Sequence, residues 1–185
     1  MTDRKLFNPF PGLRPFGAEE DYLFFGREEQ TRELLQLLRT HRFLAVVGTS
    51  GSGKSSLVRA GLLPALYGGT MVGVGSDWST VVFRPGGDPL LNMAEAMIEA
   101  DLYDPDDEEA PLRIRATLSR SRLGLVQSVK QSDLPEGTNL LIVVDQFEEL
   151  FRFRGTSPEH QGRATAFVKL LLNAGADPTL TDEQG

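Results

Sequence analysis

The chain has 185 residues, of which 40% are hydrophobic, so it can form one packed domain with a short appendage. Its net charge of −7 disfavours general nucleic-acid binding, which usually needs a basic surface. The absence of cysteine excludes disulfides, thiolate metal sites and cysteine nucleophiles. The sequence shows neither a signal peptide nor an apolar run long enough to span a bilayer, which predicts a cytoplasmic protein without a membrane partner.

The first elements in chain order are an arm, a helix and a strand. Residues 1–24 are rich in proline and phenylalanine, which predicts an extended N-terminal arm whose Phe side chains pack on the domain that follows. A helix is expected to open at residues 26–29, because leucines at positions 34, 35, 37 and 38 form an apolar stripe. Residues 43–47 are an apolar run that ends at glycine, which predicts a buried strand.

A helix is expected from about Lys54, kinked or ended by Gly61 and Pro64. Residues 78–83 predict a second strand, and residues 89–100 predict a helix. The inward-facing residues of that helix should be Leu90, Met93, Ala94 and Met97.

An acidic, solvated loop is expected at residues 101–109, followed by a helix at 112–129. The arginines of this helix are interpreted as a solvated face rather than a phosphate patch; they are Arg113, Arg115, Arg120 and Arg122. Residues 140–144 predict the third strand and 161–174 the last helix. This alternation of strands and helices predicts an α/β fold with a parallel sheet and right-handed crossovers.

One motif predicts a phosphate site between the first strand and the next helix. It matches G-x-x-x-x-G-K-[ST] at every fixed position. Its residues are Gly48, Thr49, Ser50, Gly51, Ser52, Gly53, Lys54 and Ser55. The glycines let backbone N–H groups approach phosphate oxygens, and the start of the following helix adds a positive field. We therefore expect Lys54 to reach the β- and γ-phosphates and the Ser55 hydroxyl to ligate Mg²⁺.

A second acidic element is needed for hydrolysis. Asp145 follows the apolar run 140–144, where the carboxyl end of a parallel strand would present it to a ligand, and we expect it to hold Mg²⁺ mostly through water. Glu148 and Glu149 are both candidates for the catalytic base, and Gln146 could orient water as a neutral group. Acidic residues at a helix start would also explain the two glutamates. His41 and His160 stand in no metal spacing and are expected to be solvent-facing or structural.

Several segments together resemble the novel STAND NTPases, a class of signal-transducing ATPases related to the AAA+ proteins. The resemblance covers about residues 6–174. It rests on residues 8–16, 24–28, 48–66, 78–89 and 145–151. It implies a P-loop NTPase three-layer sandwich with a mainly parallel sheet, in which residues 48–55 are Walker A and the strand ending at Asp145 is Walker B.

The resemblance also implies a function. The relatives are switches in which ATP binding favours an oligomerising active state and hydrolysis resets it. It implies that Phe25, Gly26 and Arg27 line the adenine side of the pocket, that the arm packs beside the nucleotide, and that Ser56 extends the nucleotide-binding loop. ATP and Mg²⁺ are the expected cofactors. A homo-oligomer in the full-length context and a protein partner of unknown identity are the expected assemblies.

In the family pattern, the last helix is followed by a strand that bears an arginine sensor and then by a helical lid or winged-helix region, and we recognise neither before Gly185. We therefore expect an arm at 1–24, a partial NTPase core at 25–174 that is incomplete at its C-terminus, and a tail at 175–185. The tail is either the end of the family helix or the start of an ankyrin-like unit, which residues 168–180 resemble.

These features leave two functions open. One is an ATP-dependent switch whose hydrolysis is slow or absent in this fragment, and the other is a non-hydrolysing scaffold with an ankyrin-like binding element. A GTPase and a transporter ATPase are disfavoured, since the sequence lacks Asn-Lys-x-Asp and Leu-Ser-Gly-Gly-Gln.

Overall fold

The computed structural model describes residues 12, 14–68, 77–152 and 158–176. The chain divides into two compact units, an N-terminal unit of Met1–Ser76 and a C-terminal unit of Asp77–Gly185. Most of the proline-rich arm, residues 1–11 and 13, lies outside the described residues, as do residues 177–185 of the tail.

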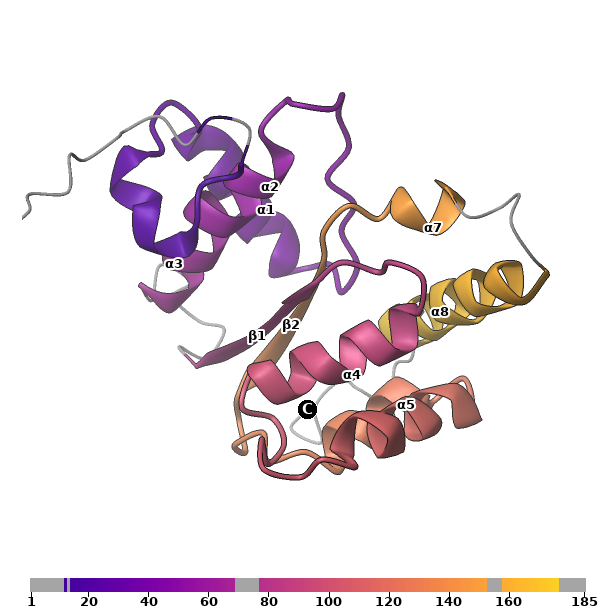
Figure 1. The fold of residues 1–185 in the computed structure, drawn as a ribbon. Coiled ribbons are helices and arrows are strands. Elements are labelled where there is room, and N and C mark those ends of the chain that lie inside the picture. The colour runs from indigo at the N-terminus through magenta and orange to yellow at the C-terminus, as the bar shows by residue number, and fades with distance from the viewer. Residues whose placement is uncertain (1–11, 13, 69–76, 153–157, 177–185) are drawn as a thin grey trace, which may run out of the picture. The chain divides into compact units, whose positions relative to one another are not determined.

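The regular structure of the N-terminal unit is helical in the part that the structure describes (Figure 1). Its elements are the 3₁₀ helix η1 (Ala18–Leu23), α1 (Glu28–Leu38), α2 (Lys54–Ser56), the π-helix η2 (Leu57–Leu62) and α3 (Leu63–Tyr67). Both η1 and α1 pack against η2. The helices expected at residues 26–29 and from Lys54 are therefore present, and η1 adds a helical turn to the stretch that was expected to be extended.

Proline widens the helix after Lys54 instead of ending it. The Leu63 N–H donates to the carbonyl of Val58, five residues back, so this turn is π-helical. Pro64 has no N–H to donate, and in a regular α-helix its ring would collide with the carbonyl four residues earlier. The wider π turn before Pro64 relieves that collision, and the backbone stays helical through Leu62 and Leu63 into α3.

Gly61 permits a close contact between η2 and α1. A Cβ atom at this position would lie 2.6 Å from Thr31 Oγ1, which is closer than such atoms can approach. The glycine that was expected to kink or end the helix thus has a packing role.

The prediction of a strand at residues 43–47 is wrong, because this segment has no regular structure. Phe43 is 50% exposed and Val47 is 89% exposed, so the run is not buried either. A strand requires a neighbour to satisfy its backbone groups, and the sheet that the described residues form pairs two other strands. Apolar composition indicated burial here, but it carried no information about a pairing partner.

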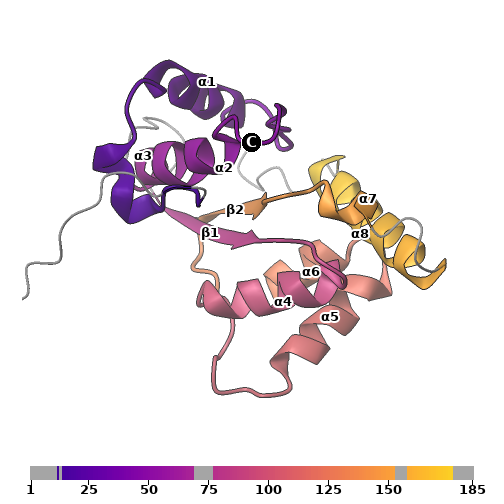
Figure 2. The same ribbon diagram turned by 45° about the horizontal axis from the view of Figure 1, so that its top comes forward.

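The C-terminal unit contains a two-stranded parallel sheet, as the alternation of elements predicts. The strands β1 (Trp78–Phe83) and β2 (Asn139–Val144) pair in a register that runs from Trp78 opposite Asn139 to Phe83 opposite Val144. The helices of this unit are α4 (Pro89–Glu99), α5 (Ala110–Arg120), α6 (Gly124–Lys130), α7 (Glu149–Arg152) and α8 (Pro158–Ala176). In Figure 2 the arrowheads of both strands point to the side where α7 and α8 lie. A small parallel sheet with helices agrees with the expected α/β class.

The core of this unit lies between β1 and the helices α4, α5 and α8. Helix α4 contacts β1, α5 and α8. The four residues predicted to face inward are all buried, which confirms that prediction; they are Leu90, Met93, Ala94 and Met97. The ring of Phe167 meets the ring of Phe83 edge-on at 5.9 Å, so α8 and β1 share one core.

The single helix expected at residues 112–129 is two helices, α5 and α6. The backbone of Ser121 is extended, and its hydroxyl accepts a hydrogen bond from the Leu123 N–H at 3.1 Å. A Cβ atom at Gly124 would lie 2.4 Å from the carbonyl oxygen of Leu118, so only glycine allows the chain to turn back this tightly. The apolar periodicity continues through the break and therefore concealed it.

Helix α8 is a single helix of 19 residues, and its start and end lie slightly outside the predicted 161–174. Phe167 and Leu170 are buried in the core of the C-terminal unit. Neither α8 nor any other helix among the described residues is long and apolar enough to cross a membrane.

Candidate nucleotide site

The glycines of the phosphate-binding motif adopt the backbone that the motif requires. Gly51 has φ +79° and Gly53 has φ +84°, both in the left-handed region that disfavours side chains. A Cβ atom at either position would meet nothing within 4 Å, so the requirement lies in the backbone angle and not in crowding. These two residues turn the chain so that α2 begins at Lys54, directly after the loop.

Lys54 folds back over this loop. Its Nζ donates to the carbonyl oxygens of Gly48 and Thr49, each at 2.9 Å. The Leu57 N–H donates to the carbonyl of Gly53 at 2.8 Å and closes the first helical turn. The loop therefore combines an ammonium group with the N-terminus of a helix, two features that attract an anion.

Arg27 is held at the same loop. Its Nη2 donates to the carbonyl of Ser52 at 3.3 Å, and its own carbonyl accepts from the Thr31 N–H at the start of α1. Gly26 has φ +81°, and Phe25 is 76% exposed. The structure thus brings Arg27 to the motif, whereas the adenine-side role of these three residues stays a prediction.

The end of the arm is attached to the helix that follows the motif. The Phe16 N–H donates to the hydroxyl of Ser56 at 3.1 Å. The chain on both sides of Phe16 is held by Glu20, which accepts hydrogen bonds from the Arg14 guanidinium and from the Gly17 N–H at 2.9 Å. The hydrogen bond from Arg14, and to a smaller extent the one from Gly17, stabilises the ionised carboxylate and lowers the pKa of Glu20 to about 2.

Asp145 lies in the C-terminal unit and follows a strand, as expected, although the sequence analysis had placed it in one core with the phosphate motif. It directly follows β2, is 9% exposed, and its N–H donates to the carbonyl of Phe83 at 2.8 Å. Gln146 has φ +57°, a conformation that is strained for a residue with a long side chain. The carboxyl end of β2 therefore leads into a tight turn over residues 145–148.

The two glutamates after this turn have different surroundings. The Glu149 carboxylate accepts a hydrogen bond from the Gly86 N–H at 3.2 Å, and the side chain is partly buried. Glu148 is exposed and makes no side-chain hydrogen bond or ion pair within the described part of the chain. Glu149 begins the short helix α7, so the helix start that was the alternative explanation of the glutamates is present at this residue.

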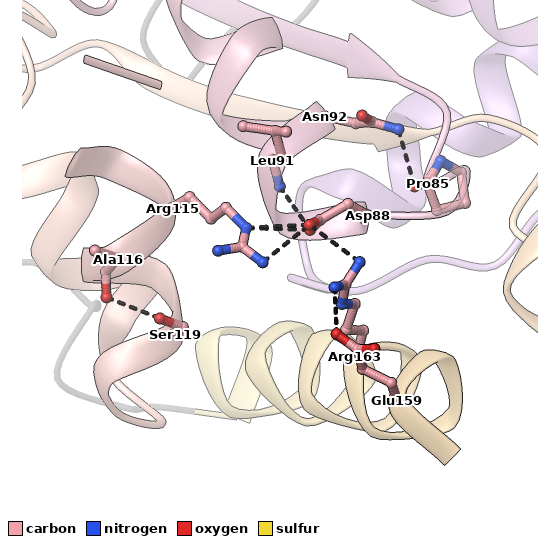
Figure 3. Close-up of polar contacts among 9 residues, drawn as sticks. All are labelled: Pro85, Asp88, Leu91, Asn92, Arg115, Ala116, Ser119, Glu159 and Arg163. Atoms are coloured by element: carbon pink, nitrogen blue, oxygen red, sulfur yellow. Dashed lines mark hydrogen bonds and ion pairs between the residues drawn. The ribbon is translucent and has the colours of Figure 1, made fainter. Parts of the chain in front are cut away.

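Asp88 is the centre of an ion cluster that the sequence analysis missed (Figure 3). Its carboxylate accepts from the Leu91 N–H at 3.3 Å and so caps α4, and Arg115 of α5 donates to both of its oxygens at 2.9–3.3 Å. Arg163 of α8 approaches at 3.5 Å and also pairs with Glu159 at 2.7 Å. One carboxylate therefore joins three helices.

The electrostatics of this cluster favour the ionised carboxylate. Burial acts to raise the pKa of Asp88, but the hydrogen bonds from Arg115 and Leu91 and the charges of Arg115 and Arg163 outweigh it, so the pKa lies below its ordinary value. Arg115 is thus not part of the solvated face that was expected. The signal that could have revealed this cap was the pair Asp88-Pro89, since aspartate is a favoured cap and proline a favoured first helical residue.

The predicted site residues belong to both units, the motif to the N-terminal unit and Asp145, Glu148 and Glu149 to the C-terminal unit. Among the described residues no group of three or more His, Asp or Glu side chains could hold a metal ion by itself.

Comparison with known proteins gives one finding. The model of the family described as novel STAND NTPase 1 matches residues 9–182, a span that includes parts of both units and every predicted site residue. Comparisons with curated proteins and with solved structures gave no significant match.

Proposed function

Because this chain belongs to the novel STAND NTPase 1 family, we propose that it binds ATP with Mg²⁺ at residues 48–55 and acts as a nucleotide-dependent signalling switch. The observation that carries the proposal is the geometry of the loop. Gly51 and Gly53 have the left-handed backbone of a phosphate cradle, and Lys54 stands at the start of the following helix. Outside a phosphate site, a lysine at a helix N-terminus opposes the helix dipole.

The residues present fit a triphosphate and its metal. At Gly48 a Cβ atom would lie 3.0 Å from Ser52 Oγ, so this position favours a residue without a side chain. Lys54 Nζ already reaches the carbonyls at the start of the loop, and it would exchange these for phosphate oxygens. The Ser55 hydroxyl and the Asp145 carboxylate are oxygen donors of the kind that Mg²⁺ prefers. When bound, the metal would neutralise phosphate charge.

Hydrolysis requires a group that orients water. Asp145 stands at the carboxyl end of β2, and Glu148, Glu149 and Gln146 follow it. A general base contributes on the order of 10²–10⁴-fold, so the turnover of this domain depends strongly on whether one of these groups reaches the water. We propose slow hydrolysis, with ATP binding as the main event.

The proposal also covers the adenine contacts, the rest of the sheet and the assembly of the protein. Phe25, Gly26 and Arg27 would contact the adenine side of ATP, since Arg27 already contacts the loop and Phe25 offers an exposed ring. The sheet of β1 and β2 would form part of a three-layer P-loop sandwich. The ATP-bound form would assemble with further copies of the protein and would act on a protein partner.

A nucleotide titration tests the binding proposal. ATP, ADP and GTP are titrated with and without Mg²⁺ into the chain and into Lys54→Ala, with Lys130→Ala as the control because Lys130 is an exposed lysine at the end of α6. We expect Lys54→Ala to abolish or strongly weaken ATP binding and Lys130→Ala to leave it unchanged. Equal affinity of all three proteins would refute the proposal.

The alternative is a scaffold that binds ATP without hydrolysis and uses an ankyrin-like C-terminal element. The continuous α8 favours the switch, because the ankyrin-like residues up to Ala176 are the second half of a long helix with Phe167 and Leu170 in the core. Asp145→Asn separates the two functions. It should remove Mg²⁺-dependent turnover in a switch, whereas a scaffold would show no turnover to lose.

A further inference from the structure

The loop between β1 and α4, residues 84–88, is fixed by side chains from several elements. The Asn92 amide of α4 donates to the carbonyls of Arg84 and Pro85 at 3.2 and 3.0 Å. Asp88, at the end of the loop, is tied to α5 and α8 through its ion cluster. These contacts hold the first and last residues of the loop.

The middle of the loop is held by Glu149. The Gly86 N–H donates to Glu149 Oε2 at 3.2 Å in a partly buried setting, across 63 positions of sequence. Gly86 has φ +52°, and a Cβ atom there would lie 2.7 Å from Asn92 Nδ2. A polar N–H in such a setting needs its partner, because an unpaired one loses the hydrogen bonds that water would supply.

The fixed loop begins beside Asp145. The parallel register ends with Phe83 opposite Val144, and the Asp145 N–H donates to the Phe83 carbonyl, so the next residues along, Arg84 and Asp145, are neighbours at the carboxyl edge of the sheet. Arg84 is exposed and makes no side-chain hydrogen bond or ion pair among the described residues. The loop that Glu149 holds therefore carries a cation at the edge where parallel sheets bind ligands.

We propose that Glu149 is a positioning residue, which holds the β1–α4 loop and Arg84 in place through Gly86, and that Glu148 is the carboxylate that activates water. This inference rests on the proposed function, because it assigns the roles within the proposed ATP hydrolysis. Its physical basis is the difference between the two side chains. The Glu149 carboxylate accepts a backbone hydrogen bond, whereas the Glu148 carboxylate makes no such contact with any residue that the structure describes.

The two roles respond differently to glutamine. A glutamine carbonyl can accept the Gly86 N–H as a carboxylate does, but an amide cannot take a proton from water. Glutamine should therefore rescue a positioning residue and inactivate a base. Alanine removes both capacities and serves as the reference for complete loss.

The experiment compares Glu149→Gln, Glu149→Ala and Glu148→Gln in the whole chain. It measures ATP turnover against pH, ATP affinity, and the amide signal of Gly86 by NMR. We expect Glu149→Ala to shift the Gly86 signal and lower turnover, and Glu149→Gln to restore most of both. Glu148→Gln should lower turnover by about 10²–10⁴-fold, remove the loss of turnover on the acidic side of the pH profile and leave the Gly86 signal in place.

Two results would overturn the inference. If Glu149→Gln loses as much turnover as Glu148→Gln, then Glu149 is the base. If the Gly86 signal is unchanged in Glu149→Ala, the hydrogen bond does not hold the loop. A chain that binds ATP without any turnover would instead refute the hydrolysis in the proposed function and the role of Glu148, while the Gly86 signal would still decide the positioning role.

Discussion

Substitution of Asp88 tests how the C-terminal unit is held together. Asp88→Asn keeps the cap of α4, because asparagine caps helices as well as aspartate does, but it removes the negative charge between Arg115 and Arg163. Asp88→Ala removes both the cap and the charge. The two variants therefore separate the contribution of the cap from that of the ion cluster.

The burial of the Asp88, Arg115 and Arg163 side chains determines how much stability the substitutions should cost. The Asp88 side chain is 20% exposed and those of Arg115 and Arg163 are 36% and 34% exposed, so the cluster lies between a surface pair and a buried one. Surface pairs contribute up to about 1 kcal/mol, and breaking a buried pair costs about 3–5 kcal/mol. We expect about 1–2 kcal/mol of lost stability for Asp88→Asn, and about 1 kcal/mol more for Asp88→Ala through the lost cap.

Urea unfolding followed by circular dichroism measures these differences. Asp133→Asn is the matched control, since Asp133 is exposed and makes no side-chain hydrogen bond or ion pair in the described residues. If Asp88→Asn is as stable as the unchanged chain, the ion cluster does not stabilise the fold. If Asp88→Asn and Asp88→Ala are equally destabilised, the cap does not contribute.

The difference in stability between the unchanged chain and Asp88→Asn should also depend on pH. Because the pKa of Asp88 is lower in the folded chain than its ordinary value of 3.8, the ionised carboxylate stabilises the fold at pH values above 3.8. This contribution is lost as the pH falls through the folded pKa. The gap between the unchanged chain and Asp88→Asn should therefore be full at neutral pH and shrink below pH 3.8.

Two further predictions concern glycine packing and the arm. Gly61→Ala should destabilise the N-terminal unit by about 1–3 kcal/mol in thermal unfolding, because the new Cβ would collide with Thr31. The control Gly162→Ala, which has open space around it in α8, should stabilise the chain by up to about 1 kcal/mol. Similar effects at both positions would contradict the close contact between Gly61 and Thr31. Arg14→Ala should raise the pKa of Glu20 from about 2 toward its ordinary value of 4.5, which an NMR titration of Glu20 measures; an unchanged midpoint would show that Arg14 does not hold this carboxylate.

Local patterns predicted the C-terminal unit well. Strong β-forming runs gave β1 within residues 78–83 and β2 one residue longer than expected, and the spacing of Met93 and Met97 identified the buried face of α4. The phosphate motif also predicted the local backbone, because two of its glycines adopt left-handed angles that few other residues tolerate. Such features depend on residues close in sequence, and a single sequence displays them.

Features that depend on distant partners were not predictable in this way. The run at 43–47 has the composition of a strand but pairs with no strand in the described residues. The break between α5 and α6 depends on the contact between Gly124 and the Leu118 carbonyl, and the role of Asp88 depends on arginines 27 and 75 positions away. The sequence identifies residues that are able to make such contacts, but the contacts that form depend on how the whole chain folds.

The left-handed backbone of Gln146 has a consequence for how this domain can change. Asp101, the other described non-glycine residue with positive φ, ends α4, where the Leu102 N–H donates to Met97 and the Asp101 N–H to Ile98, so its conformation completes a helix terminus. Gln146 follows Asp145 and closes no helix. Selection for stability alone would replace Gln146 with glycine or asparagine, which tolerate this conformation. A domain stabilised in this way would no longer carry the amide that we propose could orient water, so stability and the proposed activity would make opposite demands on this one position.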